Sequence, residues 1–301
     1  MRPASRFVGL PKSFWAYVRS ISAKVGYTER LTKKIKVPSE KEIEVALAEL
    51  SLSAAQLRTS GGKPTKLARD LADYFRYRAR TLNQTVRPLL MDAREAGALF
   101  RKVRASLRSS APILMNKQKG KKRQPAFLTG LVNMLVDAHR KEVPCDLDPR
   151  QLTSVTKDGF PVRTLARRVD GAFPSAINPV ALWEIKEYYH TTTFGSRVAD
   201  GVYETLLDGM ELEELRQNES IHVKHYLILD ARFTWWECGR SYLCRVIDML
   251  HMGYVDEVLF GRETLKRLPE LVKGWVREVR CRSPLKQPTP RSGRWGTRLS
   301  Q

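Results

Sequence analysis

The sequence predicts an α/β protein in which a mixed central sheet is flanked by helices and preceded by a mainly helical, basic N-terminal region. Three observations carry this prediction. Apolar residues recur at helical spacing through the first 110 residues, and from Pro125 onward short apolar strands alternate with amphipathic helices. Positive charge is concentrated early: residues 1–150 carry 31 Lys and Arg against 13 Asp and Glu, whereas the whole 301-residue chain has a net charge of +21.

The N-terminal region is expected to contain helices in three stretches. SEKEIEVALAEL begins with Ser39 and places Glu42 three residues later, the spacing of a capping box. The second helix follows the Gly-Gly break at 61–62 and runs to about Leu82, with its apolar residues on one face. The third covers MDAREAGALFRKVRASL. The first two helices could form a helix-turn-helix variant, or a helical layer whose arginines touch phosphate or solvent.

Basic residues cover the rest of the second helix and fill a low-complexity loop, NKQKGKKRQ, at 116–124. A positive charge of this size is typical of proteins with a polyanionic partner, nucleic acid ahead of membrane surface. We interpret these residues as contacts to a phosphate backbone, which gives salt-dependent affinity; a solvated linker is the alternative for the loop. The candidate contacts are Lys66, Arg69, Arg76, Arg78, Arg80, Lys119, Lys121, Lys122 and Arg123.

The pattern divides the chain into a basic helical region at 1–125, an α/β core at 126–281 and a flexible basic tail at 282–301. The core is expected to begin with a helix, FLTGLVNMLVDAHR, and a strand within GFPVRTLARRVDGAF that ends near Asp170. After these come the strand VALWEIKEYY, the helix FGSRVADGVYETLLDGMELEEL, the strand HVKHYLILDARF, the helix RSYLCRVIDMLHMG, the strand VDEVLFG and a last helix, RETLKRLPELVKGWV, kinked at Pro269. The order is α-β-β-α-β-α-β-α.

Several functional classes are disfavoured by what the sequence lacks. No apolar run of about 18 residues predicts a membrane span, and the N-terminus has no secretory signal pattern, so a cytoplasmic protein is expected. The four cysteines show no CxxC spacing, which argues against structural zinc. Neither a GxSxG turn nor a GxxxxGK[ST] phosphate loop occurs.

Two carboxylates and an ammonium group stand out on otherwise apolar strands. Side chains alternate along a strand, so Glu184 and Lys186 share one face while Ile185 points to the other. If the strand ending near Asp170 pairs with this one as a hairpin, its carboxylate comes beside Glu184. Two close carboxylates suit Mg²⁺ or Mn²⁺, with the lysine beside an attacking water. The alternative is a surface Glu–Lys pair worth well under ~1 kcal/mol.

Asp170 followed by Glu184-Ile185-Lys186 resembles the PD-(D/E)xK nuclease superfamily, of which type II restriction endonucleases are a branch, and the element order over roughly 126–260 resembles that family's core. The resemblance implies that Asp170 and Glu184 ligate the metal together with the main-chain carbonyl of Ile185, while Lys186 serves the attacking water. Val169 stands where the family often has proline. The acid that many members carry on the preceding helix has Asp137 and Glu142 as its candidates here.

The resemblance and the charge together predict a Mg²⁺-dependent endonuclease that cuts double-stranded DNA, of the type II restriction class. Cutting both strands with one site per chain implies a homodimer, and a restriction enzyme implies a companion methyltransferase. Two alternatives stay open. One is a nuclease with the same core that acts in repair, junction resolution or modification-dependent cutting. The other is a non-catalytic DNA-binding protein whose acids are structural.

Overall fold

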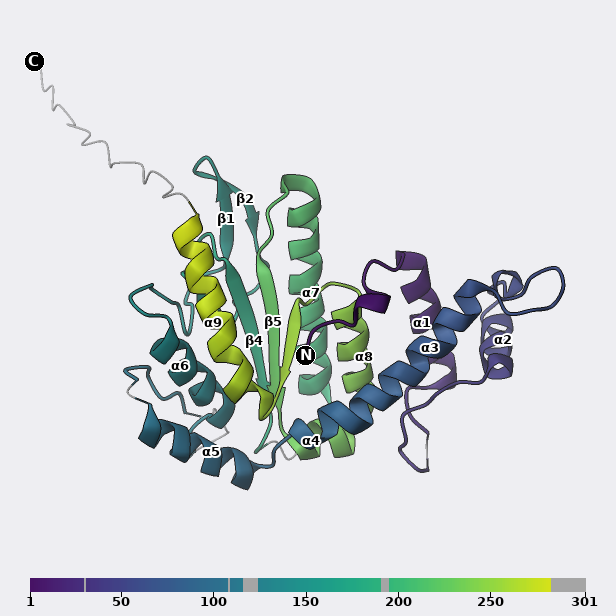
Figure 1. Ribbon diagram of the computed structural model, residues 1–301, viewed down its shortest axis with the longest axis horizontal. Coiled ribbons are helices and arrows are strands. Elements are labelled where there is room, and N and C mark those ends of the chain that lie inside the picture. The colour runs from purple at the N-terminus through teal and green to yellow at the C-terminus, as the bar shows by residue number, and fades with distance from the viewer. Residues whose placement is uncertain (30, 108, 116–123, 191–194, 283–301) are drawn as a thin grey trace, which may run out of the picture.

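The computed structural model describes residues 1–29, 31–107, 109–115, 124–190 and 195–282. A mixed sheet lies between two layers of helices, and a helical arm extends from one side (Figure 1). The predicted α/β class with a mixed, helix-flanked sheet is therefore confirmed. Within the described ranges, no helix combines the length and apolar character needed to cross a bilayer.

The central sheet has four strands in the order β3-β4-β5-β6. The first pair is antiparallel, and the two pairs that follow are parallel. Helices supply both parallel crossovers, α7 between β4 and β5 and α8 between β5 and β6. The bounds are Gly171–Phe173 for β3, Ala181–Glu187 for β4, Ser196–Glu219 for α7, Lys224–Asp230 for β5, Arg240–His251 for α8 and Glu257–Phe260 for β6. A π-helical turn, Phe233–Cys238, precedes α8.

The stretch before β3 differs from the expected single strand. An antiparallel hairpin, β1 at Ser154–Lys157 and β2 at Phe160–Thr164, ends six residues before Asp170. Its turn is Asp158-Gly159, and both residues have positive φ, 52° and 85°, as a tight two-residue hairpin turn requires. The chain then runs without regular structure through 165–170. This irregular segment carries Arg167.

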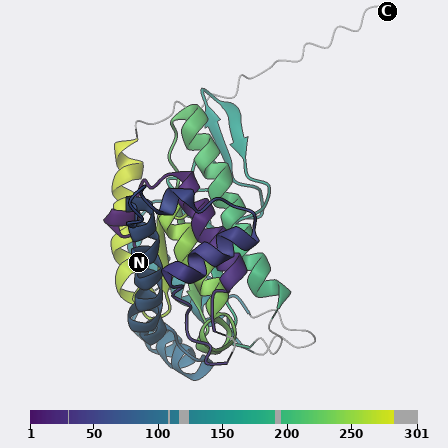
Figure 2. The ribbon, with the colours of Figure 1, turned by 90° about the vertical axis from the view of Figure 1, so that its right-hand side faces the viewer.

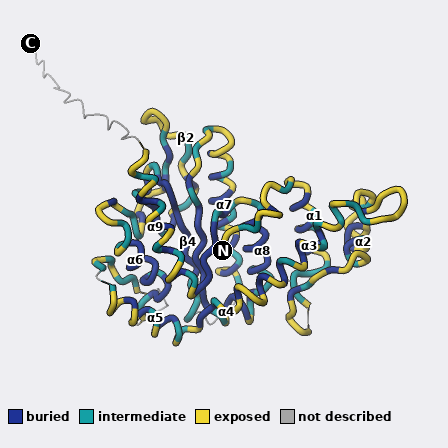
Figure 3. The backbone as a smooth tube through the Cα atoms, viewed as in Figure 1, coloured by how far each residue is buried: buried dark blue, intermediate teal, exposed yellow. Residues whose placement is uncertain are grey.

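The two faces of the sheet have opposite chemistry along β4. Trp183 and Ile185 point into an apolar layer with α6, at Phe127–His139, and α9, at Glu263–Cys281. The Trp183 ring stacks on Trp275 of α9, with ring centroids 5.4 Å apart. Glu184 and Lys186 point to the other face, toward α7, and both are buried. Nearly all of β4 belongs to the buried class (Figure 3). Charged side chains buried on a central strand need partners within the protein.

Helix α6 is held to the sheet by the last residue of β4. Leu128 N and Thr129 N donate to Glu187 Oε2 over 2.5 and 3.1 Å, so this carboxylate accepts from two N–H groups that the first turn of a helix leaves unpaired. On the same face, α9 continues through Pro269 as one helix.

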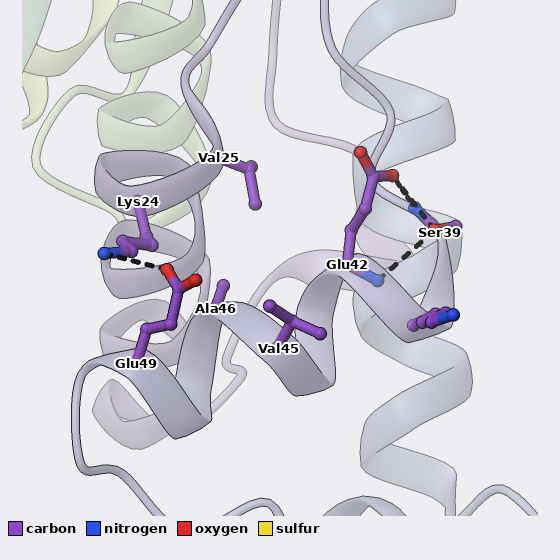
Figure 4. A pocket seen from close by; sticks show the side chains of 8 residues that line it. Lys24, Val25, Ser39, Glu42, Val45, Ala46 and Glu49 are labelled. Atoms are coloured by element: carbon purple, nitrogen blue, oxygen red, sulfur yellow. Dashed lines mark hydrogen bonds and ion pairs between the residues drawn. The ribbon is translucent and has the colours of Figure 1, made fainter.

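The N-terminal arm consists of α1 at Lys12–Val25, α2 at Glu40–Glu49 and α3 at Lys66–Thr81, with short 3-10 turns at Ser5–Phe7 and Ala55–Leu57. They enclose an aromatic core that includes Phe14, Trp15 and Tyr74. The expected capping box is present: Ser39 Oγ accepts from Glu42 N, and the Glu42 carboxylate accepts from Ser39 N (Figure 4).

The arm joins the core through one nearly continuous helical path. Helix α3 passes through a π-helical turn, Leu82–Val86, into the short α4 at Arg87–Leu89, and α5 follows at Ala93–Ser106. Seen along the arm, α3 lies across the front of the molecule and leads down to α5 (Figure 2). Helix α5 packs on α6 through apolar residues that include Phe100, Val103 and Leu131.

The prediction that Arg78 contacts DNA is wrong. Its guanidinium is buried, with 1% of the side chain exposed, and lies 3.0 Å from both Asp248 carboxylate oxygens on α8. Tyr74 Oη donates to the same carboxylate over 2.6 Å. Arg78 is therefore a tie between the arm and the core and cannot reach a phosphate. A fully buried cation is tolerated here because its counter-charge and hydrogen bonds are buried with it.

We expect Arg78→Met to destabilise the protein by about 3–5 kcal/mol, because the buried Asp248 carboxylate loses its counter-ion. Arg80→Met, two residues along the same helix but exposed, is the matched control and should cost less than about 0.5 kcal/mol. Urea unfolding followed by circular dichroism measures both. Equal effects of the two substitutions would contradict a structural role for the Arg78–Asp248 pair.

Glu187 makes the stability depend on pH. Burial raises the pKa of Glu187 to about 7, above the 4.5 of a free side chain, although the Thr129 and Leu128 N–H groups lower it. A raised folded-state pKa stabilises the protein fully below pH 4.5, and this contribution is lost as pH rises through 7. Relative to wild type, Glu187→Gln should therefore gain stability between pH 5 and pH 8, by on the order of 2 kcal/mol.

Unfolding curves of both proteins at the two pH values test this expectation. The difference between them isolates Glu187 from other buried acids. The exposed Glu142→Gln is the control, and it should track wild type at both pH values. A constant difference between wild type and Glu187→Gln would remove Glu187 from the pH dependence.

Candidate functional site

Asp170 lies just beyond the paired end of β3, beside β4. Strand β3 begins at Gly171, which pairs with Trp183, so no strand covers this edge of β4 at Ile185. Asp170 takes that place: its N–H donates to Trp183 O over 3.2 Å, and its Oδ2 accepts from Ile185 N over 2.7 Å. Because the N–H and C=O of one strand residue point to the same side, the Ile185 carbonyl faces the same edge as Asp170.

Glu184 and Lys186 meet on the α7 face of the sheet. Lys186 Nζ lies 2.8 Å from Glu184 Oε2, and only 10% of the lysine side chain and none of the glutamate is exposed. Helix α7 lies close here because it has glycine at 201. A Cβ at Gly201 would fall 2.7 Å from Tyr188 Oη and 3.1 Å from Lys186 Cδ.

Three further charged residues complete the cluster, and none of them was predicted from the sequence. Arg167 comes from the irregular segment after β2, while Glu204 and Asp208 lie one turn apart on α7. Arg167 Nη1 is 2.9 Å from Glu184 Oε1 and 2.7 Å from Asp208 Oδ2. Glu204 Oε2 lies 2.8 Å from Lys186 Nζ and 3.4 Å from Arg167 Nη2.

Burial and the nearness of other carboxylates shift the pKa values of the acids in the cluster. Burial and the charge of Glu184 raise the pKa of Asp170 to about 6, and the same two causes raise the pKa of Asp208 to about 7. Burial acts to raise the pKa of Glu184 too, but Lys186 and Arg167 outweigh it and hold that pKa below its usual value. Perturbation of this kind is typical of functional sites, although ion-pair networks produce it as well.

Lys186 is held in its charged form. Burial acts to lower the pKa of Lys186, but Glu184 and Asp170 outweigh it and raise the pKa above that of a free lysine. In this arrangement the ammonium group can orient a water or stabilise negative charge.

The carboxylate oxygens of the cluster are ligands of the type that a hard cation prefers, but they do not surround a common point. Glu184 Oε1 and Asp208 Oδ1 are buried and accept no hydrogen bond. Carboxylate oxygens and a main-chain carbonyl are the ligands that Mg²⁺ and Mn²⁺ prefer. Across the described parts of the chain, however, no three His, Cys, Asp or Glu side chains converge as metal ligands. The Arg167 guanidinium lies among the carboxylates instead.

The acids considered for the helix before the first strand lie elsewhere. Asp137, near the end of α6, accepts from Ser109 Oγ and Ser110 N and pairs with Arg140 at 2.9 Å. Its role is to hold the segment after α5 against α6. Glu142 is exposed in the loop that follows. The helix acids beside Glu184 come from α7, which follows the strand.

The remaining predicted DNA contacts fall into two groups. Lys66, Arg69, Arg76 and Arg80 are exposed and recur at steps of three, seven and four residues, so they share one face of α3. Two of these side chains have carboxylate neighbours on the same helix: Lys66 lies 2.6 Å from Asp70 and Arg76 lies 3.3 Å from Asp73. Lys119, Lys121, Lys122 and Arg123 lie outside the described residues, as does the predicted tail from residue 283 on.

Helix α5 adds a basic surface that the sequence analysis did not single out. Its exposed cations make no ion pair with any carboxylate in the described residues; they are Arg94, Arg101, Lys102 and Arg104. In Figure 1, α5 lies at the lower end of the sheet, toward which β4 runs, while the β1–β2 hairpin lies at the opposite end.

A hollow between α1 and α2 has no part in this cluster. Its lining includes Lys24, Val45 and Glu49 (Figure 4), and all of its residues belong to the N-terminal arm. The Lys24–Glu49 ion pair, at 2.8 Å, spans it.

Comparison with known proteins gives two family matches and no function. No curated protein and no solved structure matches the chain. Residues 1–85 match a family model described as a domain of unknown function, DUF7690. Residues 91–275 match a second model, the domain of unknown function DUF7687. The matches meet at 86–90, earlier than the division near residue 125 that the charge distribution predicts. The second match spans more than half of the chain, so the chain belongs to the DUF7687 family.

Proposed function

We propose that the protein is a Mg²⁺-dependent endonuclease acting on double-stranded DNA, of the PD-(D/E)xK type. One observation carries the proposal: Glu184 and Lys186 lie together on β4, and Asp170, which directly precedes the antiparallel strand β3, accepts from Ile185 N between them. Their order and spacing resemble the superfamily signature. The strand order β3-β4-β5-β6, with only the first pair antiparallel, is compatible with that core.

The proposed chemistry assigns each group a separate task. Asp170, Glu184 and the Ile185 carbonyl would hold the ion, since all three belong to β4 or the edge beside it. When bound, a divalent ion supplies positive charge that polarises a phosphodiester and activates water. Lys186 keeps its proton, so it would orient the attacking water and stabilise charge on a non-bridging phosphate oxygen.

Two exposed basic surfaces support a nucleic-acid substrate. The α3 face and the α5 face both carry cations, and residues 1–150 have most of the chain's excess positive charge. Contacts of this kind give affinity without reading sequence. Site specificity of the type II kind, a homodimer that cuts both strands, a companion methyltransferase and Mn²⁺ as a substitute metal belong to the same proposal. Repair, junction resolution and modification-dependent cutting would use the same core.

A second candidate is a DNA-binding protein without catalysis. The observation that favours it is the closed ion network, in which Arg167 and Lys186 already neutralise part of the carboxylate charge. Under this reading the cluster fastens α7 to β4. Cleavage assays separate the two candidates directly.

The nuclease proposal predicts that supercoiled plasmid is cut in Mg²⁺ and left intact in EDTA. Asp170→Asn, Glu184→Gln and Lys186→Met should each lower the cutting rate at least about 100-fold, because each removes a metal ligand or the charged group beside the water. DNA affinity in Ca²⁺ should change by less than about threefold. Gel assays measure cutting, and fluorescence anisotropy measures binding.

Glu214→Gln is the matched control for these variants. Glu214 also lies on α7 and pairs with an arginine of β2, Arg163, at 2.7 Å, but 56% of its side chain is exposed. Cutting by this control should equal that of wild type. If wild type cuts nothing in Mg²⁺ or Mn²⁺ while DNA binding persists, the non-catalytic candidate is correct.

We also expect the exposed face of α3 to bind DNA. Neutralising its four cations should weaken binding to every sequence and reduce the slope of log Kd against log salt by up to about 0.9 per lost contact. The residues changed to Gln are Lys66, Arg69, Arg76 and Arg80.

The control removes equal charge from other exposed positions, with Gln at Lys141, Arg150, Lys157 and Arg216. Only the α3 variant should lose salt-dependent affinity. An equal loss in both variants would show that net charge matters and that α3 is not the contact surface.

A further inference from the structure

Arg167 lies where a metal ion could lie. Its guanidinium nitrogens contact three carboxylates at once, at 2.9 Å from Glu184, 2.7 Å from Asp208 and 3.4 Å from Glu204. These acids come from β4 and from two successive turns of α7, so the position is fixed by regular structure on both sides. The arginine itself comes from the irregular segment at 165–170, the least regular part of the site.

The carboxylates have oxygen atoms that accept no hydrogen bond from the guanidinium. Asp208 is fully buried and turns its Oδ2 to Arg167, yet its Oδ1 accepts no hydrogen bond. Glu184 Oε1 lies within ion-pair distance of Arg167 but likewise accepts no hydrogen bond. Buried carboxylate oxygens are normally satisfied, so an oxygen left without a donor needs an explanation such as an unfilled ion position.

Charge balance points the same way. Asp170, Glu184, Glu204 and Asp208 face two cations, Arg167 and Lys186. With all four acids ionised, the cluster has an excess of two negative charges. Divalent ions bind where carboxylates outnumber the cations near them. The imbalance is local to the guanidinium, since the three carboxylates of Glu184, Glu204 and Asp208 surround the single charge of Arg167.

We propose that Glu184, Glu204 and Asp208 form a second divalent-cation position, which the Arg167 guanidinium occupies until an ion replaces it. The proposal rests on the proposed function only in that Glu184 serves both ions; the binding itself needs no substrate. The arginine is not sealed inside the site, because 23% of its side chain is exposed. The two ions would share Glu184, as in two-metal phosphodiester hydrolases.

The test counts Mn²⁺ bound in the absence of DNA, by electron paramagnetic resonance and calorimetry. Arg167→Met removes the competing cation, so it should tighten binding at the second position at least tenfold and bring the count from about one to about two. Asp208→Asn added to Arg167→Met should return it to about one. Arg168→Met, an exposed neighbour that makes no ion pair in the described residues, should bind like wild type.

Stability provides a second readout. Without metal, Arg167→Met leaves Glu184 and Asp208 unpaired, so its Tm in EDTA should fall below that of wild type. Mn²⁺ should raise the Tm of Arg167→Met more than it raises that of wild type. If Arg167→Met is unfolded in EDTA and also in Mn²⁺, the ion does not replace the guanidinium and the proposal is wrong.

The Mn²⁺-binding results distinguish the second cation position from the proposed nuclease function. Unchanged Mn²⁺ binding in Arg167→Met overturns the second position, even if plasmid cutting depends on Glu184 as proposed above. Conversely, tightened Mn²⁺ binding that Asp208→Asn abolishes supports the position even if no DNA is cut. The two proposals can therefore fail separately.

Discussion

The site depends on burying the Glu184 carboxylate on the inner face of a central strand. A fully buried carboxylate is costly to desolvate, and the surrounding structure is arranged to offset that cost. Lys186 lies two residues along the same strand, Gly201 lets α7 approach, and Arg167 covers the carboxylate from the segment after β2. Removing either cation leaves Glu184 with one charged partner in place of two.

A buried charged cluster can be a structural ion-pair network or a cation site, and the carboxylate oxygens of this cluster favour a cation site. A structural ion pair needs balanced charge and satisfied hydrogen bonds. This cluster has four acids against two cations, and two of its buried oxygens accept no hydrogen bond. The excess of oxygen donors is what a divalent ion requires. Under the proposed function, the arm and α5 would provide the positive surfaces for a polyanionic substrate.

Local signals in the sequence predicted most of the fold. The Ser39–Glu42 capping box, the apolar periodicity of α6 and α7 and the apolar run before Glu184 each indicate one element without reference to the rest of the chain. The side-by-side placement of Glu184 and Lys186 followed from strand alternation alone. The hairpin β1–β2 differs from the prediction because the expected strand begins at Gly159, the second residue of the Asp-Gly turn, and no element was expected at β1.

Tertiary partners could not be predicted in the same way. Arg78 has the spacing of a surface arginine. Only the folded structure shows that Asp248, 170 residues away, offsets the cost of burying its charge. Arg167 and Asp208 lie 41 residues apart on elements of different type, so no motif links them. Asp137, in contrast, matched the expected helix but faces Ser109 and Arg140. Such errors arise wherever a charged side chain finds its partner through the fold.

An anomalous-scattering experiment on Mn²⁺-soaked crystals tests the central claim most directly, because it locates the ion without requiring activity. The account predicts a peak bonded, at about 2.1 Å, to oxygens of Asp170 and Glu184 and to the Ile185 carbonyl. Crystals soaked in saturating Mn²⁺ that show no peak at these residues would contradict it, and Asp170 and Glu184 would then be structural acids of a basic protein.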